Sequence, residues 1–448
     1  MSVDRQIVVV GGGLAGGLLS IMLRRRGYEV RVYERHSDSR RGAEYGGRSI
    51  NLALSHRGLR ALDRVGLAEA ALERAIPMRG RQIHRASGGS QFQPYSPYAG
   101  QYINSISRAG LNELLLDQAE EEGVDVRFEH ACVGVDFEHR SVIVEDSRTG
   151  SRATVRDAVV FGTDGAGSAV RRSMEEQGLT VASSEFLDHG YKELTMPAAG
   201  DGTHRLASVE CLHIWPRRAF MLIALPNLDG SFTCTLFLAL NGSVSFDALK
   251  TNRDIAAFFQ SEFPDAAAHM PNLISDFRDN PVSTLGTVRC YPWRVEGFTL
   301  LLGDAAHAIV PFYGQGMNSA FEDCLVLDDL LESGDSDWTT VFRSFESARK
   351  PDADAIAQLA LANFVEMRDK VADPRFALRK QLEIELARRF PNEYTPIYSH
   401  VTFSNIPYSE ALLFAETQAA ALDTFLNGVS SIDDVNWDEA ASLVKELI

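Results

Sequence analysis

The chain has 448 residues, 45% of them hydrophobic, so it is long enough to form two or more globular units. Its 44 Lys and Arg residues against 61 Asp and Glu residues give a net charge of -17, which argues against nucleic acid as a partner. The five cysteines include no CxxC pair, which predicts reduced thiols and no metal site: Cys132, Cys211, Cys234, Cys290 and Cys324. Because no signal-peptide pattern or membrane-length apolar window is present, we expect a soluble, cytoplasmic protein without a membrane partner.

The first elements expected along the chain form a βαβ unit. Residues 6–10 (QIVVV) predict a buried strand, helical spacing then leads to Gly27, and residues 29–33 (EVRVY) predict a second strand. A helix is expected at 110–123. Further strands are expected near 125–137, 141–146 and 153–162.

The second half of the chain has a different pattern. From about 183 to 300 the sequence alternates and carries aromatic residues, which predicts an inserted antiparallel sheet. After residue 318 we expect helices nearly to the end, with breaks near 333–338, 391–397 and 428–434.

A glycine-rich turn lies between the first predicted strand and helix. Gly11, Gly13 and Gly16 are spaced as GxGxxG, and Glu34 follows the second strand. Glycines at this spacing let the backbone approach a pyrophosphate at a helix N-terminus, and a carboxylate here can accept hydrogen bonds from a ribose. The motif therefore predicts FAD or NAD and does not choose between them.

Two further strand-to-helix turns favour FAD. Residues 158–171 (AVVFGTDGAGSAVR) contain Asp164 before a glycine, and residues 301–318 (LLGDAAHAIVPFYGQGMN) contain Gly303-Asp304. With the first motif, these turns resemble the FAD-dependent aromatic hydroxylases of the para-hydroxybenzoate hydroxylase fold. The resemblance implies that Asp304 binds the flavin ribityl chain and that the following loop runs along the flavin ring.

Eight longer segments resemble the kynurenine 3-monooxygenase family within these hydroxylases, and they occur in the family's order. They are GRSINLALSHRGLRAL (47–62), IPMRGRQIH (76–84), HGYKELTMP (189–197), LHIWPRRAFMLIALPN (212–227), SFTCTLFL (231–238), LLGDAAHAIVPFYGQGMN (301–318), NFVEMR (363–368) and YSHVTFSNIPY (398–408). The resemblance implies conversion of L-kynurenine to 3-hydroxykynurenine with FAD, NADPH as a transient co-substrate, and O2.

The fold class expected from this resemblance is α/β. A Rossmann-type FAD-binding domain would comprise residues 1–182 and 287–330, an inserted β-sheet substrate domain residues 183–286, and a C-terminal helical region residues 331–448. The cofactor-binding residues implied are Gly11, Gly13, Leu14, Ala15, Gly16, Glu34, Arg35, Arg48, Leu54, Arg108, Asp164, Gly303, Asp304, Gly314, Gly316, Met317 and Asn318. The implied residues of the flavin loop are Pro311, Phe312, Gln315 and Gly316.

The resemblance also implies a substrate site. Arg81, Tyr95 and Asn363 would hold the amino-acid carboxylate, and a guanidinium matches a carboxylate in both charge and geometry. The other implied substrate residues are Tyr398, Leu212, Met221, Ile223, Leu225, Phe237, Phe312, Glu366 and Met367, with Pro311 beside them. No side chain is expected to serve as a general acid or base, and we expect a structural or flavin-adjacent role for His307.

Several alternatives stay open at this point. His400 stands where the family pattern has Met, Tyr313 occupies a variable position, and Tyr98 and Tyr102 compete with Tyr95 for the carboxylate. The substrate could be a modified kynurenine or another 2-aminophenyl compound. A nicotinamide-dependent dehydrogenase would explain only the first motif, whereas a flavin- or metabolite-binding protein without activity would explain all of the glycines. A homodimer is one of the open oligomeric states.

Overall fold

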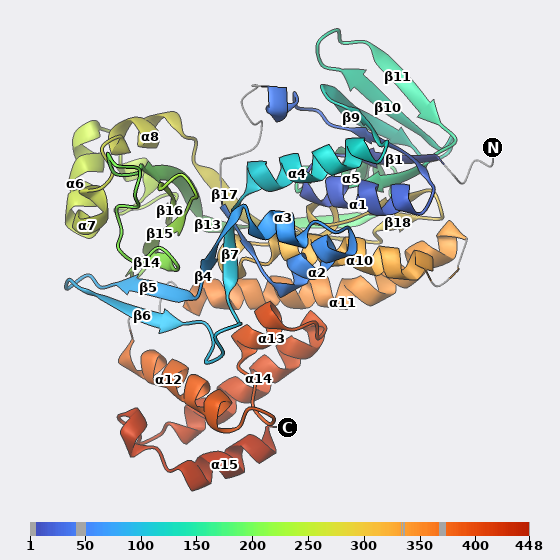
Figure 1. Cartoon of the computed structure of the whole chain (residues 1–448). Helices are drawn as coiled ribbons and strands as arrows, with labels where there is room; N and C mark the ends of the chain where they lie inside the picture. The colour runs from blue at the N-terminus through green and yellow to red at the C-terminus, as the bar shows by residue number, and fades with distance from the viewer. Residues whose placement is uncertain (1–5, 42–50, 333, 335–336, 367–372, 448) are drawn as a thin grey trace. The chain divides into compact units, whose positions relative to one another are not determined.

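The computed structural model describes residues 6–41, 51–332, 334, 337–366 and 373–447 (Figure 1). The chain divides into two compact units. The nucleotide unit comprises residues 1–74, 106–185 and 286–357, and the sheet unit comprises residues 75–105, 186–285 and 358–448. The three-part domain division expected from the sequence stays a prediction.

The nucleotide unit is built on a six-stranded sheet with strand order β18-β19-β12-β1-β2-β8. Its central strands β12, β1 and β2 are parallel. Strands β1 and β2, with the helix between them, form the βαβ unit that the sequence predicts. A separate three-stranded antiparallel sheet has the order β11-β10-β9. The strands of this unit are β1 (Gln6–Val10), β2 (Glu29–Tyr33), β3 (Asn51–Leu54), β8 (Asp125–Arg127), β9 (His130–Asp136), β10 (Ser141–Asp146), β11 (Arg152–Arg156), β12 (Val159–Gly162), β18 (Arg294–Val295) and β19 (Thr299–Leu301).

Helices α1 and α4 pack against each other on this sheet, and α10 packs against both α1 and α2. Leu18, Leu19 and Ile21 of α1 are buried because the apolar residues of this helix face the sheet. The helices of the nucleotide unit are α1 (Leu14–Arg25), η2 (Ser39–Arg41), α2 (His56–Arg64), α3 (Ala68–Leu72), α4 (Arg108–Glu121), α5 (Ala169–Glu176), α9 (Asp304–His307), η4 (Pro311–Tyr313) and α10 (Gly316–Glu332).

The sheet unit is built on a sheet with strand order β17-β13-β16-β15-β14-β5-β6. One face packs against α6, α7 and α8 in a core that includes Trp215, Leu222 and Phe259. The elements of this part are β4 (Ala75–Met78), β5 (Gly80–His84), β6 (Ser90–Pro94), β14 (Leu212–Arg217), β15 (Phe220–Pro226), β16 (Phe232–Ala239), η3 (Phe246–Ala248), α6 (Asn252–Glu262), α7 (Pro264–Ala267) and α8 (Leu273–Asp279).

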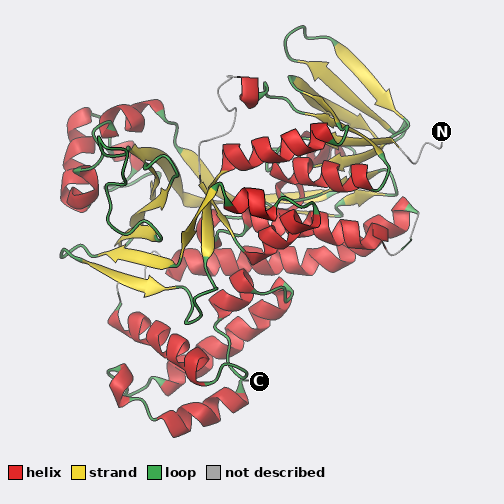
Figure 2. Cartoon of the chain, in the orientation of Figure 1, coloured by secondary structure: helices red, strands yellow, loops and turns green. Residues whose placement is uncertain are grey.

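From residue 373 onward, the described part of the chain contains helices and loops (Figure 2). The helices are α12 (Pro374–Arg389), α13 (Ile397–Phe403), α14 (Tyr408–Phe425), η6 (Ile432–Asp434) and α15 (Trp437–Glu446). Four elements cross the boundary between the units: β7 (Ile103–Ser107), β13 (Val181–Met196), β17 (Ser283–Tyr291) and α11 (Trp338–Val365). Among the described residues, no helix is both long enough and apolar enough to cross a lipid bilayer.

One expectation for the sheet unit was wrong. Residues 252–279 form helices and not strands, because α6 begins with a Thr251–Asp254 capping box and its apolar residues fall at helical spacing. The predicted antiparallel pairing is confirmed for the strands of this segment, β13 with β16, β16 with β15 and β15 with β14. Strand β5, from outside the segment, extends the sheet by pairing with β14 in parallel. The predicted interruption near 391–397 falls between α12 and α13, and the one near 428–434 falls between α14 and α15, although it contains the short helix η6. The one near 333–338 includes residues outside the described part of the chain.

Candidate functional site

Three glycines shape the turn between β1 and α1. Gly11 has a φ of +102°, a region that favours glycine, and a Cβ there would lie 2.7 Å from the carbonyl oxygen of Thr163. A Cβ on Gly16 would lie 1.9 Å from the carbonyl oxygen of Gly11. A Cβ on Gly13 would meet no described atom within 4 Å, and no side chain caps α1. The backbone amides at the start of α1 are therefore available to an anion.

Glu34 lies beside this turn. Its carboxylate accepts a hydrogen bond from the backbone N–H of Gly12 at 2.8 Å and another from that of His36 at 2.8 Å. A carboxylate can accept about four hydrogen bonds, so Glu34 retains capacity for ribose hydroxyls. Leu14 and Ala15 begin α1, and Arg35 is exposed with its Nε 3.1 Å from Nε2 of His36.

Asp164 follows β12, the neighbour of β1. Its Oδ2 accepts the backbone N–H of Ala169 at 2.6 Å, whereas its Oδ1 is buried without a partner among the described residues. Burial raises the pKa of Asp164. Burying an oxygen without a hydrogen bond raises the free energy of the folded protein, so this atom is suited to accept a hydrogen bond from a ligand.

Asp304 is the first residue of α9, directly after Gly303. Its side chain is exposed, although the surrounding protein desolvates the carboxyl and raises its pKa, an effect that the nearby Arg108 opposes. The Nε of Arg108 is buried without a hydrogen-bond partner among the described residues. An exposed carboxylate on Asp304 and an unpartnered N–H on Arg108 fit a polar ligand that both accepts and donates hydrogen bonds.

The loop from Pro311 to Asn318 is fixed by one amide side chain. Asn318 accepts the backbone N–H of Ser55 at 3.0 Å and donates to the carbonyl oxygens of Ala53 at 2.8 Å and Gly314 at 2.9 Å. Gly314 has a φ of +67° and belongs to this turn. The side chain of Asn318 therefore holds the loop, and its predicted contact with a cofactor stays a prediction.

The other predicted residues around this loop occupy different environments. Pro311 is exposed, Gly316 begins α10, and Phe312, Gln315, Met317 and Leu54 are buried. Pro311 and Phe312 belong to the nucleotide unit, and their predicted contact with substrate stays a prediction.

A second polar cluster lies in the sheet unit. The guanidinium carbon of Arg81 lies 5.4 Å from the ring centroid of Tyr95 and 5.3 Å from that of Tyr398, and the two rings stack at 5.0 Å. The Nε of Arg81 and the phenol oxygen of Tyr95 are buried, and neither has a hydrogen-bond partner among the described residues. We name Arg81, Tyr95 and Tyr398 the clamp; Tyr398 was predicted to line the aromatic pocket, and the structure places its ring against Tyr95 and Arg81.

The charge states of the clamp suit an anion. Burial lowers the pKa of Arg81, but the neighbouring Tyr95, Tyr398 and Glu366 outweigh it and raise that pKa above its ordinary value. Burial raises the pKa of both phenols, that of Tyr95 well above the ordinary value. Arg81 is therefore a cation and both tyrosines stay protonated, so the clamp presents hydrogen-bond donors beside a positive charge.

The structure distinguishes the three tyrosines of residues 95–102. Tyr95 lies against Arg81, whereas the hydroxyl of Tyr98 donates to the carbonyl oxygen of Ala387 at 2.9 Å. The guanidinium carbon of Arg79 lies over the ring of Tyr102, 5.2 Å from the ring centroid. Tyr95 is the member of this group in the clamp.

The predicted apolar residues share a face of the sheet with Arg81. Arg81 pairs with Leu212 in register, Ile214 pairs with Ile223, and Met221 pairs with Phe237. Because successive side chains alternate between faces, the intervening residues point to the opposite face, where Leu222 and Ala224 join the core with α6–α8. Leu212, Met221, Ile223, Leu225 and Phe237 therefore form an apolar surface that leads away from the clamp.

The remaining substrate-side predictions fall on α11 and beyond. Asn363 is buried, and Glu366 forms ion pairs with Arg379 at 3.4 Å and Lys380 at 3.5 Å. The predictions for Arg48 and Met367 lie outside the described residues.

His400, which departs from the family pattern, stacks on Phe414 of α14 with ring centroids 5.0 Å apart. Burial lowers the pKa of His400. The imidazole is therefore a packing partner of α14. Tyr313 is half-buried in η4.

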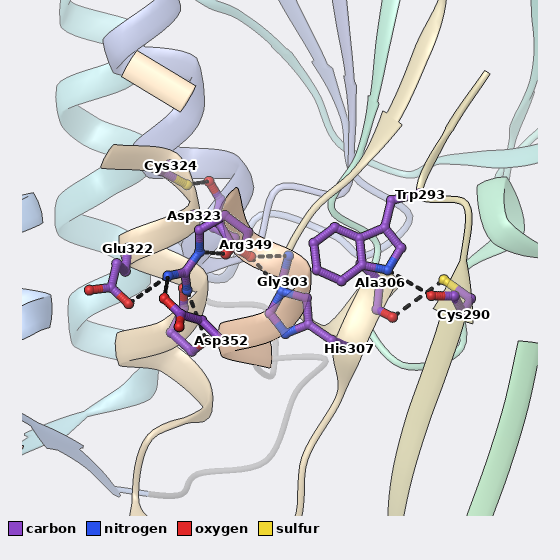
Figure 3. Close-up of polar contacts among 12 residues, drawn as sticks. Cys290, Trp293, Gly303, Ala306, His307, Glu322, Asp323, Cys324, Arg349 and Asp352 are labelled. Atoms are coloured by element: carbon purple, nitrogen blue, oxygen red, sulfur yellow. Dashed lines mark hydrogen bonds and ion pairs between the residues drawn. The ribbon is translucent and has the colours of Figure 1, made fainter. Parts of the chain in front are cut away.

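The sequence did not reveal a cluster of buried charges beneath α9 (Figure 3). Asp323 accepts hydrogen bonds from the backbone of Gly303 at 2.9 Å and from Nε of Arg349 at 2.7 Å, and Nε2 of His307 lies 2.6 Å from it. The one sequence signal was that the stretch after Asp304 contains no acidic or basic residue except His307 until Glu322 and Asp323 occur together.

Comparisons with known proteins agree with this geometry. The chain matches the FAD binding domain family over residues 4–358, which favours a flavin over the nicotinamide-dependent alternative. It is 49% identical to the kynurenine 3-monooxygenase of Myxococcus xanthus, over 98% of this chain and 94% of that protein. It is 44% identical to the kynurenine 3-monooxygenase of Flavobacterium johnsoniae, over 100% of each chain.

Solved structures show the same fold at low identity. The chain is similar to the p-nitrophenol 4-monooxygenase of Pseudomonas putida, with a TM-score of 0.68 and 20% identity over 92% of this chain and 97% of that one. It is also similar to the tetrameric form of 2-methyl-3-hydroxypyridine-5-carboxylic acid oxygenase, with a TM-score of 0.67 and 22% identity over 85% of this chain and 97% of that one. The expected fold class is confirmed, and the chain belongs to the FAD binding domain family and, within it, to the kynurenine 3-monooxygenase family.

Proposed function

We propose that this protein is an FAD-dependent monooxygenase that uses NADPH and O2 to hydroxylate L-kynurenine to 3-hydroxykynurenine. The observation that carries the choice of substrate is the pair of unpartnered buried donors on Arg81 and Tyr95. Buried polar atoms without partners are rare in folded proteins, and an amino-acid carboxylate supplies the acceptors that both of them need. Family membership supports the same substrate.

The residues of the nucleotide unit fit FAD. The glycine turn and the uncapped start of α1 would bind the pyrophosphate, and Glu34 would accept hydrogen bonds from the ribose. Asp304, which is exposed and lies near Arg108, would bind the ribityl hydroxyls, and the unpartnered oxygen of Asp164 fits another donor of the cofactor. When bound, FAD supplies the transfer of one oxygen atom from O2 to the aromatic ring, with electrons from NADPH.

The residues of the sheet unit would select and orient the substrate. Arg81 and the phenol of Tyr95 would hold the carboxylate, and Asn363 would complete this contact. The apolar surface from Leu212 to Phe237 would cover the aminophenyl ring and exclude water from it. The ring amine of kynurenine already activates the carbon next to it, so no side chain needs to act as a general base.

We also propose that the protein acts in the cytoplasm. All five cysteines are unpaired and four of them are buried, which suits a reducing compartment. Its net charge of -17 favours solubility.

The test is to incubate the flavin-loaded protein with NADPH, O2 and L-kynurenine and to detect 3-hydroxykynurenine by mass spectrometry. Product should form and should depend on both the enzyme and NADPH. The Arg79→Ala variant is a matched control, because Arg79 is exposed and pairs with Glu210 and should keep near-normal turnover. If flavin-loaded protein forms no 3-hydroxykynurenine but oxidises NADPH with another 2-aminophenyl compound, the proposed substrate is wrong and the alternative substrate is favoured.

A further inference from the structure

Helix α9 is a single turn that carries Asp304, and hydrogen bonds from other parts of the nucleotide unit hold its backbone in place. The carbonyl oxygen of Ala305 accepts a hydrogen bond from Nη1 of Arg171 at 2.6 Å, and that of Ala306 accepts one from the thiol of Cys290 at 3.3 Å. The ring of His307 lies 5.1 Å from that of Trp293 (Figure 3). In contrast, the Asp304 side chain is exposed, so the direction of its carboxylate depends on how the turn itself is held.

One carboxylate holds both ends of this turn. Oδ2 of Asp323, on α10, accepts the backbone N–H of Gly303 at 2.9 Å and lies 2.6 Å from Nε2 of His307. Gly303 precedes α9 with a φ of +56°, and a Cβ there would lie 3.0 Å from the Cβ of Ala320. Because a carboxylate only accepts hydrogen bonds, this contact places a proton on Nε2 of His307.

Asp323 is itself held by a buried series of alternating charges (Figure 3). Its Oδ1 accepts Nε of Arg349 at 2.7 Å, and Nη1 of Arg349 also donates to Glu322 at 2.8 Å and Asp352 at 3.2 Å. Glu322 in turn accepts Nη1 of Arg57 at 2.5 Å. Burial raises the pKa of Asp323, but His307 and Arg349 outweigh it and lower that pKa to about 2. Asp323 is therefore ionised under ordinary conditions and is a strong acceptor.

We propose that Asp323 is a positioning residue for the cofactor: by binding Gly303 and His307 at once, its carboxylate fixes the turn that aims Asp304 at the ribityl chain of FAD. This inference rests on the proposed role of Asp304 as a ribityl ligand. It assigns Asp323 no contact with FAD or substrate. It predicts that FAD affinity depends on Asp323 and His307, which hold α9, and much less on the other carboxylates bound to Arg349.

The test compares two isosteric variants, Asp323→Asn and Asp352→Asn. Both remove a carboxylate from Arg349, but Asp323 also binds Gly303 and His307 at the two ends of α9, whereas Asp352 lies on α11 and binds Arg349. FAD is titrated into each apoprotein, and affinity is measured by the change in flavin fluorescence. Asp323→Asn should raise the Kd for FAD about tenfold or more, and Asp352→Asn by less than about threefold. Equal effects in the two variants, or an unchanged Kd in Asp323→Asn, would overturn the proposal.

A second pair of variants keeps the proposal testable if Asp323→Asn fails to fold. His307→Gln retains an N–H donor for Asp323, whereas His307→Leu removes it at a buried position. His307→Gln should keep a Kd for FAD within about threefold of wild type and a wild-type visible spectrum of bound flavin, and His307→Leu should weaken binding and shift the spectrum. Equal weakening by Gln and Leu would overturn the proposal.

These titrations need neither substrate nor turnover. An unproductive wild-type protein that binds FAD normally would therefore refute the proposed reaction and leave the role of Asp323 intact. A wild-type protein without affinity for FAD would refute the cofactor assignment itself, and with it the proposed role.

Discussion

The nucleotide unit and the sheet unit present ligand-binding groups in different ways. In the nucleotide unit the groups available to a ligand are the backbone amides of the turn after β1. Glycines within a few residues of one another shape this turn, and Gly11 has a φ of +102°. In the sheet unit the clamp, which we propose binds the substrate carboxylate, consists of long side chains from distant segments, with Arg81 on β5 and Tyr398 on α13.

This difference predicts two kinds of mutational damage. A glycine whose missing side chain lets two backbone segments touch cannot be changed without moving those segments, so stability and ligand binding should fall together. In the clamp, Nε of Arg81 and the hydroxyl of Tyr95 have no hydrogen-bond partner among the described residues, so removing either atom breaks no such bond. Loss of either group should therefore weaken substrate binding and leave the fold and the flavin content intact.

The largest effect is expected from Gly16→Ala. Its Cβ would lie 1.9 Å from the carbonyl oxygen of Gly11 and 2.7 Å from Oγ1 of Thr163, so the turn must open. We expect loss of bound flavin, about 100-fold weaker FAD binding or worse, together with a lower melting temperature. The measurements are the ratio of flavin absorbance to protein absorbance and thermal denaturation.

Gly13→Ala sharpens this prediction, because its Cβ meets no described atom within 4 Å. FAD affinity should fall while the stability of the apoprotein stays within about 0.5 kcal/mol of wild type. Gly200→Ala, which also meets no described atom, should change neither quantity. If Gly13→Ala binds FAD normally, the pyrophosphate does not approach this turn.

Arg81→Ala should have the next largest effect. Losing a charge-assisted contact with a carboxylate costs about 1.5–3 kcal/mol, which corresponds to roughly a 10- to 150-fold higher KM for L-kynurenine. Flavin content should be unchanged, because Arg81 belongs to the sheet unit. Steady-state kinetics test the prediction with Arg79→Ala as the control, and an unchanged KM would refute the clamp.

Tyr95→Phe should have a smaller effect because it removes only one donor. We expect a KM increase of roughly tenfold, at the low end of the range for hydrogen bonds to charged groups. Tyr98→Phe removes a hydroxyl that donates to Ala387 and should leave KM unchanged while costing about 1 kcal/mol of stability. A raised KM in Tyr98→Phe together with an unchanged KM in Tyr95→Phe would assign the carboxylate to Tyr98.

The smallest effect is expected on the pH dependence of stability and concerns Asp323. Unlike the glycine turn of the same unit, Asp323 acts through a side chain, which binds Gly303 and His307. Its pKa is lowered from 3.8 to about 2, so the stability it contributes is present above pH 3.8 and is lost as the pH falls toward about 2. Between about pH 5 and pH 3, the stability difference between wild type and Asp323→Asn should shrink by about 1 kcal/mol. Urea unfolding of the two apoproteins at each pH measures this stability difference. A difference that grows as the pH falls would contradict the prediction.

The sequence predicted the elements whose contacts are local. The strands at 6–10 and 29–33 agree with β1 and β2 because a strand, a glycine turn and a helix leave a short-range pattern. The parallel pairing of β5 with β14 was not predictable in this way, since it joins segments more than 100 residues apart and depends on the tertiary fold. Helices α6–α8 were missed because the aromatic-rich strands on both sides dominated the pattern of that region.

The candidate site divides in the same way. The glycines and Asp304 were proposed from a motif in the sequence, whereas the proposal of Tyr95 over Tyr98 and Tyr102 rests on contacts that only the structure gives. The partners of Asp323 come from α9 and α11, and no spacing in the sequence brings Arg349 beside His307.

The most direct test of the account is substrate discrimination by the clamp. Kynuramine is kynurenine without its carboxylate, so it should lose the contact with Arg81 while keeping its fit to the apolar surface. The wild-type protein should prefer L-kynurenine over kynuramine by about tenfold or more in kcat/KM, and Arg81→Ala should reduce that preference to within about threefold. A preference that persists undiminished in Arg81→Ala would show that the carboxylate is bound elsewhere and would contradict the account.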